Sequence, residues 1–138
     1  MREILFRGKR VDNGEWVYGY YVKQVDAFGA VHRIYHSASD PDDSNAVYEI
    51  DKKTVGQFTG LTDKNGKKIF EGDIVKFNTE TYTSIRDTIG VVGYYNSSYG
   101  IAYENNRHFL EFNNMSMYVR WYEIIGNIHD NQELLNEN

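Results

Sequence analysis

The sequence predicts a mainly β fold of short, strongly bent antiparallel strands, arranged as one domain with two lobes. The aromatic content is high, with 12 Tyr, 7 Phe and 2 Trp in 138 residues, and aromatic side chains favour strands. Short stretches of apolar and β-branched residues are separated by Gly, Asn and Asp, which is typical of strands joined by tight turns. A chain of this length forms one domain and can bury one core.

The N-terminal lobe is expected to span about residues 1–50 and to begin with a hairpin. Asp12-Asn13-Gly14 is a typical turn sequence between its first two strands. The stretch 37–45, SASDPDDSN, is the most polar of the chain and holds its single proline, so we expect an exposed loop between the lobes there. The strands of this lobe are predicted at residues 2–11, 15–25, 30–36 and 46–50.

The second predicted strand carries a possible interaction surface. Side chains alternate along a strand, so Trp16, Tyr18 and Tyr20 share one face. Basic residues lie near them in the sequence, as in proteins that stack single-stranded nucleic acid on aromatic rings, although the same pattern also fits a solvated face above a core. Gly19, on the other face, predicts a bend or a close backbone approach.

The C-terminal lobe is expected to span about residues 54–138, after a helical turn or a loop at 51–55 that Asp51 could cap. In the stretch Thr59–Phe77, Asn65-Gly66 predicts a two-residue type I′ turn, because both central residues tolerate positive φ. Asp63 could cap that turn with its carboxylate. Gly72 predicts a bulge or a positive φ before a β-branched strand at 74–77.

The lobe is predicted to be a small, strongly bent sheet or SH3-like barrel, closed by a short C-terminal helix. Residues 78–88 could form a long loop or an extended hairpin, and the Thr and Tyr content favours the hairpin. The apolar stretch 123–128 is expected to form a central strand. Asp130 and Glu133 have the spacing of a capping box, which predicts a helix over Leu134 and Leu135. Further strands are expected at 89–96, 101–104, 108–112 and 117–122, with turns at 97–100 and Asn105-Asn106.

The run Asp51–Val75, DKKTVGQFTGLTDKNGKKIFEGDIV, resembles the hallmark of the YopX family of bacteriophage and prophage proteins. Family members read T-[VI]-G-Q-[FY]-T-G-L-x-D-x-N-G-x-x-I-[FY]-E-G-D-I-V, and the likeness extends from Phe6-Arg7 to the tail EIIGNI. The chain departs from the family at Asp51-Lys52-Lys53, where many relatives carry a proline. The resemblance implies a YopX-like, mostly β fold of phage origin and no known activity.

Composition excludes several classes of function. Fifteen Lys and Arg against 20 Asp and Glu give a net charge of −5, which argues against broad phosphate binding. The chain has no cysteine, which agrees with a reducing host cytoplasm, and no apolar stretch long enough for a membrane span. We therefore expect a cytoplasmic protein without a membrane contact.

No catalytic motif, cofactor loop or metal-binding pattern is apparent, so we expect no enzyme, no cofactor and no metal. His32 and His36 are four apart on a predicted strand, about 13 Å, which is too far for one ion. Glu71 and Asp73 would face the same side of a strand and could form a carboxylate pair, or they could accept backbone N–H groups around Gly72. We favour a structural motif made of Gly56, Gly60, Asp63, Asn65, Gly66, Glu71, Gly72 and Asp73.

Three functional hypotheses follow. The first is a non-enzymatic phage accessory protein that self-associates and binds a host or phage protein, because the aromatic content exceeds what a small barrel buries. The second is a nucleic-acid-associated regulator that uses aromatic stacking or acidic mimicry of DNA. The third is a hydrolase that uses Glu71 and Asp73.

Overall fold

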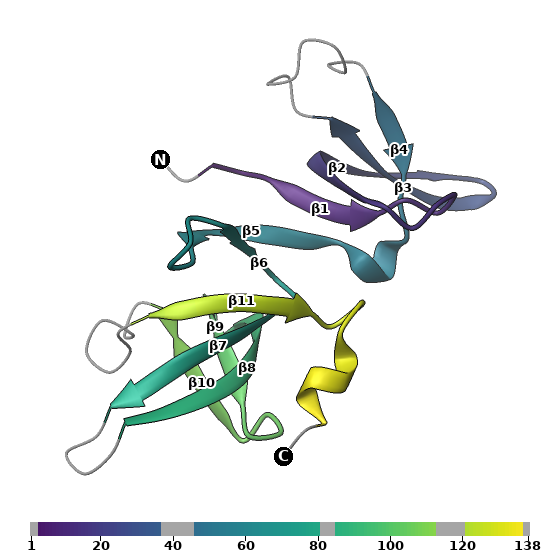
Figure 1. The fold of residues 1–138 in the computed structure, drawn as a ribbon. Coiled ribbons are helices and arrows are strands. Elements are labelled where there is room, and N and C mark those ends of the chain that lie inside the picture. The colour runs from purple at the N-terminus through teal and green to yellow at the C-terminus, as the bar shows by residue number, and fades with distance from the viewer. Residues whose placement is uncertain (1–2, 37–45, 81–84, 113–120, 137–138) are drawn as a thin grey trace. The chain divides into compact units, whose positions relative to one another are not determined.

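The computed structural model describes residues 3–36, 46–80, 85–112 and 121–136, which fold almost entirely into antiparallel strands (Figure 1). The predicted mainly β class is therefore confirmed. Two compact units are present, residues 1–58 and 59–138, and the division falls inside strand β5 (Gly56–Thr62). The predicted loop at 37–45 lies outside the described residues. In the described parts of the chain, no helix has the length and hydrophobicity needed to cross a membrane.

The first unit is a curved antiparallel sheet in the order β4-β3-β2-β1-β5. The predicted hairpin is present, because β1 and β2 pair from Phe6–Gly19 to Lys9–Trp16. After β4 comes the 3-10 turn η1, which Asp51 caps as predicted by accepting the N–H of Lys53 at 3.0 Å. The elements are β1 (Phe6–Lys9), β2 (Trp16–Asp26), β3 (Gly29–His36), β4 (Val47–Glu49), η1 (Lys52–Thr54) and the start of β5.

The first unit curls strongly because the chain after β4 returns to the end of β1. Arg10 forms an antiparallel bridge with Ile50, and the N–H of Asp51 donates to the carbonyl of Lys9 at 2.9 Å. The side chains of Ile34 and Ile50 are fully buried on the inner face. Gly8 leaves room for them, because a Cβ at Gly8 would lie 2.6 Å from Ile50 Cδ1.

The second unit contains a five-stranded sheet in the order β10-β9-β8-β7-β11 and a hairpin formed by the end of β5 with β6. Its core consists of Ile69, Val75, Phe77, Val92 and Ile101, all nearly inaccessible to solvent. The elements are β6 (Lys68–Phe70), β7 (Asp73–Glu80), β8 (Ile85–Tyr95), β9 (Ser98–Tyr103), β10 (His108–Glu111), β11 (Tyr122–Asn127) and the 3-10 turn η3 (Gln132–Leu135).

The strand pairings leave the described part of this sheet open, with β10 and β11 at its two ends. No closed barrel is found among these residues, and the SH3-like barrel stays a prediction. The extended hairpin expected at 78–88 is present, since β7 and β8 pair as far as Glu80–Ile85. Its tip, and most of the strand expected at 117–122, lie outside the described residues.

Two turns differ from the prediction. Gly66 has φ +81°, but Asn65 is not among the residues with positive φ, so the type I′ turn at Asn65-Gly66 is wrong. Instead, a three-residue loop joins Asp63 to Lys67. The two-residue turn with positive φ at both positions is Asn96-Ser97, at 50° and 65°, where a turn had been expected at 97–100.

The C-terminal predictions also need correction. The strand predicted over 123–128 as central is the edge strand β11, and its residues are only half-buried. The expected helix over Leu134 and Leu135 is a single 3-10 turn. Its N-cap is Asn131 without a side-chain hydrogen bond, so the capping box that began at Asp130 is wrong.

Gly19 is the glycine of the first unit that tolerates substitution least. A Cβ added there would lie 2.0 Å from the carbonyl oxygen of Tyr35, which confirms the predicted close backbone approach. We expect Gly19→Ala to lower the free energy of unfolding by about 3 kcal/mol or more, because backbone must move. Urea unfolding followed by circular dichroism measures this.

Gly14→Ala is the matched control in the same unit. Gly14 has φ +73° with no atom near the added Cβ, so only backbone strain of about 1 kcal/mol is expected. Equal losses in the two variants would contradict the steric account of Gly19.

Candidate functional site

The outer face of strands β2, β3 and β4 carries a row of exposed apolar side chains. Strand register places Tyr20 opposite Tyr35 and Tyr35 opposite Val47, so the three lie side by side on one face. Their exposed fractions are 58%, 40% and 44%. Val22 and Tyr18, two residues to either side of Tyr20, are exposed on the same face. We call Tyr18, Tyr20, Val22, Tyr35 and Val47 the outer face.

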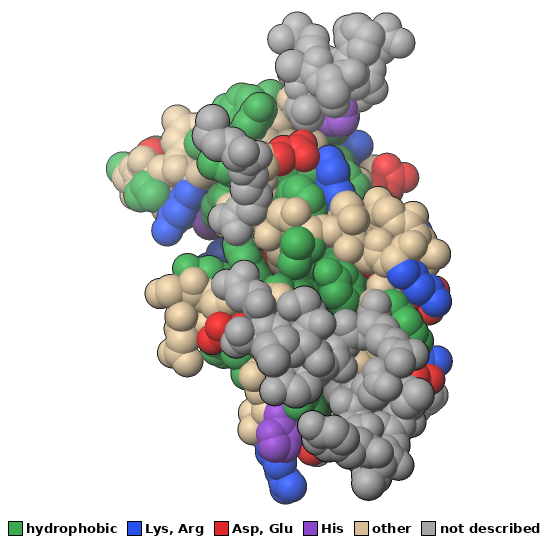
Figure 2. Space-filling model, turned by 90° about the vertical axis from the view of Figure 1, so that its left-hand side faces the viewer, with side chains coloured by type: hydrophobic (Ala, Val, Ile, Leu, Met, Phe, Trp, Pro, Cys, Tyr) green, Lys and Arg blue, Asp and Glu red, His purple; other side chains and the backbone are tan. Residues whose placement is uncertain are grey.

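The opposite face of the same strands is the core of the first unit. Ile34 lies between Arg33 and Tyr35 in the sequence and is fully buried, so its two neighbours point outward. The solvent side of a sheet is normally polar, whereas this one presents three tyrosines and two valines. A contiguous apolar patch on a soluble protein is typical of an interaction site. Figure 2 shows apolar side chains at the surface beside charges of both signs.

Of the predicted surface residues, Tyr18 and Tyr20 are exposed but Trp16 is half-buried. Two cations lie over its ring, the Arg7 guanidinium at 4.6 Å and the Lys9 ammonium at 5.5 Å from the centroid. Trp16 is therefore already in contact with β1, and cation–π attraction stabilises that contact.

Sequence reasoning missed Tyr35, Val22 and Val47. Val22 follows from alternation along β2. Tyr35 would have followed from the hairpin register, because Asp26 pairs with Gly29 across the two-residue turn Ala27-Phe28. Val47 lies across β3, and no local signal sets that register.

Charges on the outer face are nearly balanced. Arg33 and Glu49 lie opposite each other on β3 and β4, and Arg33 donates to the side chain of Gln24 at 2.8 Å. The described residues of the first unit hold seven Lys and Arg against six Asp and Glu. This balance does not form the positive groove that a phosphate backbone requires.

The second candidate is the turn that contains Asp63, in the second unit. Asp63 Oδ1 accepts the backbone N–H groups of Asn65 and Lys67, both at 2.9 Å. Asp63 Oδ2 accepts the N–H of Ile124 on β11 at 3.0 Å, and the N–H of Lys64 donates to the carbonyl of Tyr122 at 3.0 Å. One carboxylate thus closes the turn and binds it to the edge strand.

Burial of Asp63 would by itself raise its pKa, but the hydrogen bonds from Ile124, Lys67 and Asn65 outweigh it. The pKa of Asp63 therefore lies below its ordinary value. Side chains add to the contact with β11. Asn65 Nδ2 lies 3.3 Å and Lys64 Nζ 3.7 Å from Glu123 Oε2.

Of the remaining motif residues, Glu71 and Gly72 lie in a turn, whereas Gly56 and Gly60 lie in β5 and Asp73 begins β7. Gly72 has φ +88°, as predicted, donates its N–H to Val92 and accepts that of Ile128, both at 2.9 Å. Asp73 is 2% exposed, and its Oδ2 accepts the N–H of Phe70 at 2.8 Å. Strand β7 begins at Asp73 and Glu71 precedes it in a turn, so the prediction that both face the same side of a strand is wrong. Gly56 is buried in β5, and Gly60 has φ +92°.

These side chains hold backbone rather than forming a reactive cluster. Within the described ranges, no three His, Asp or Glu side chains come together to hold a metal ion. His32 Nδ1 lies 2.5 Å from the Tyr21 hydroxyl, and the two rings stack. The motif side chains of the second unit can orient strands, and the outer face of the first unit presents an apolar surface.

Asp63→Asn tests the capping carboxylate. An amide has one acceptor oxygen, so at least one of the three backbone N–H groups that Asp63 accepts, those of Asn65, Lys67 and Ile124, loses its partner. We expect the free energy of unfolding to fall by about 2–4 kcal/mol at pH 7 in urea titrations. Asp87→Asn is the control, because Asp87 is exposed and forms an ion pair with Lys76 at 3.6 Å in the part of the chain that the structure describes; it should cost about 0.5 kcal/mol or less.

The same variant has a pH signature. The pKa of Asp63 is lower in the folded state than in the unfolded state. Its contribution is therefore complete above the unfolded value of about 3.9 and is lost as pH falls through the folded value. Wild type should lose more stability than Asp63→Asn between pH 5 and the acid limit of folding, and parallel pH profiles would contradict this account.

Comparison with known proteins shows which fold and family the chain resembles. A crystal structure of protein EF1440 from Enterococcus faecalis is similar over 98% of this chain and 99% of that one, with a TM-score of 0.56 and 23% identity. That likeness concerns the fold. The comparison with curated proteins gave no match. Residues 5–136 match the family described as YopX protein, and because this covers nearly the whole sequence, the chain belongs to the YopX family.

Proposed function

We propose that this YopX protein is a non-enzymatic accessory protein of phage that works by binding protein chains, first of all a second copy of itself. The observation that carries the proposal is the exposed row of Tyr20, Tyr35 and Val47 on the outer face. Tyrosine is enriched at protein interfaces because its ring contributes contact area while its hydroxyl stays hydrated.

Charge favours a second copy as the partner. A two-fold contact brings the same patch of two subunits together, so a patch that holds both signs can pair with itself. Arg33 and Glu49 lie opposite each other beside the apolar row. A two-fold axis near them would set Arg33 of each copy beside Glu49 of the other copy. The proposed place of action is the host cytoplasm, where the assembled face could also bind a host or phage protein.

Aromatic stacking of single-stranded nucleic acid is the runner-up. Tyr18 and Tyr20 lie about 6.6 Å apart along β2, a spacing that suits successive bases. The near balance of charge in the first unit argues for protein instead. Among the basic residues near Asn65-Gly66, Lys64 already contacts Glu123 and the Trp121 ring.

The hydrolase hypothesis is the weakest. It needs Glu71 and Asp73 to present carboxylates to a substrate, but Asp73 is 2% exposed and accepts a backbone N–H. A carboxylate held in that way contributes to folding rather than to proton transfer.

Tyr20→Glu combined with Tyr35→Glu tests the proposal. The glutamates introduced at positions 20 and 35 of one copy would be repelled by the same glutamates of the other copy across a two-fold contact. We expect the wild type to sediment as a dimer at low micromolar concentration and the double variant as a monomer with an unchanged circular dichroism spectrum. Tyr94→Glu is the control, because Tyr94 is 52% exposed but belongs to the second unit.

A wild-type protein that stays monomeric at all concentrations would overturn self-association. Fluorescence anisotropy of a labelled single-stranded oligonucleotide distinguishes nucleic-acid binding from self-association. Salt-sensitive binding that Tyr20→Ala abolishes would favour nucleic acid over a second copy.

A further inference from the structure

One apolar side chain is exposed in a way that the outer face does not explain. Phe28 lies at the tip of the β2–β3 hairpin, and its side chain is 99% exposed. The strands pair without interruption from Gly19–His36 to Asp26–Gly29, and Asp26 Oδ1 accepts the N–H of Phe28 at 2.8 Å. A phenyl ring is thus held in solvent at the end of a regular hairpin.

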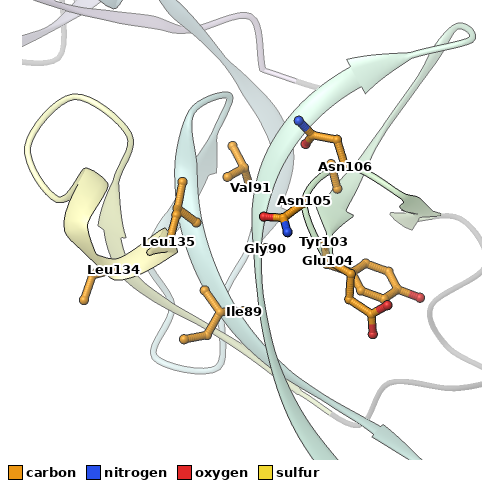
Figure 3. A pocket seen from close by; sticks show the side chains of 10 residues that line it. Ile89, Gly90, Val91, Tyr103, Glu104, Asn105, Asn106, Leu134 and Leu135 are labelled. Carbon is orange, nitrogen blue, oxygen red and sulfur yellow. The ribbon is translucent and has the colours of Figure 1, made fainter. Parts of the chain in front are cut away.

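The second unit contains a pocket of about 130 Å³ in its described residues. Figure 3 shows Leu135 of η3 and Ile89 and Val91 of β8 on one side of it. Asn105 and the other residues of the β9–β10 turn lie on the opposite side. The pocket therefore has an apolar wall and a polar wall.

The size of this pocket suits a phenyl ring. Its volume is close to that of the roughly 150 Å³ protein cavity known to bind benzene. Glu104 is the one charged residue that lines the pocket. The hairpin 16–36 has a net charge of the opposite sign, because it carries Lys23 and Arg33 against Asp26.

We propose that Phe28 of one copy inserts into this pocket of another copy. The inference rests on the proposed self-association but uses different surfaces from the outer face. A contact between unlike surfaces does not close on itself by a two-fold axis, so it extends an assembly. With the outer face joining copies in pairs, the Phe28 contact would link pairs into larger assemblies as concentration rises.

Photo-crosslinking locates the contact. The full chain, with p-benzoylphenylalanine in place of Phe28, is prepared in light and ¹⁵N-labelled forms, mixed and irradiated. We expect light–heavy cross-links that join position 28 to residues 89–91, 102–106 or 134–135. Cross-links confined to one chain, or located elsewhere, would overturn the inference.

Sedimentation of variants separates this inference from the proposed function. Phe28→Ser and Ile89→Asp should each weaken assemblies larger than the dimer at least about tenfold, as expected for an aromatic anchor, and leave the dimer intact. Ile89 is 37% exposed, so its substitution is compatible with folding. Tyr95→Ser, at 54% exposure and outside the pocket, should change nothing.

The outcomes differ for the two proposals. If Phe28→Ser assembles like wild type while Tyr20→Glu with Tyr35→Glu is monomeric, the Phe28 contact is wrong and the outer-face dimer stands. If wild type is a monomer throughout and no light–heavy cross-link forms, both are wrong.

Discussion

The second unit depends on one buried carboxylate. An edge strand exposes N–H and C=O groups that invite pairing with another chain, and proteins cover such edges. On β11, the N–H of Ile124 and the carbonyl of Tyr122 are taken by Asp63 and by the N–H of Lys64. The turn of the β5–β6 hairpin thus behaves like a short added strand. Asp63 also holds its own turn by accepting the N–H groups of Asn65 and Lys67. Loss of this carboxylate would therefore disturb both the geometry of the turn and the protection of the β11 edge.

The same constraint explains why two acidic side chains of the motif are buried: their carboxylates hold backbone. Asp63 and Asp73 are both buried, and each accepts backbone N–H groups whose desolvation would otherwise be costly. A general acid or base needs a proton acceptor that faces a substrate. In the first unit, exposed apolar side chains of the described strands gather instead on the outer face.

Local signals predicted much of the fold. Composition indicated strands, alternation located β2, and Asp51 and Gly72 took the predicted roles. The family resemblance covered nearly the whole chain. The type I′ turn failed because the side chain of Asp63 binds the N–H groups on both sides of Asn65-Gly66 and favours a three-residue loop. The turn at Asn96-Ser97 contains no glycine; across it the rings of Tyr94 and Tyr99 pack edge to face at 4.8 Å.

The outer face required information that lies far apart in the sequence. Tyr20, Tyr35 and Val47 form a row only once three strands are in register, and the segment before Val47 has no periodicity that sets it. The kind of side chain found there is informative about association. Half-exposed tyrosines keep their hydroxyls hydrated in the free protein and bury their rings on contact, at a small cost in side-chain entropy. A face built on tyrosine, with one charge of each sign beside it, suits a contact that forms and dissociates, whereas an obligate interface would be more hydrophobic, like the core of a domain.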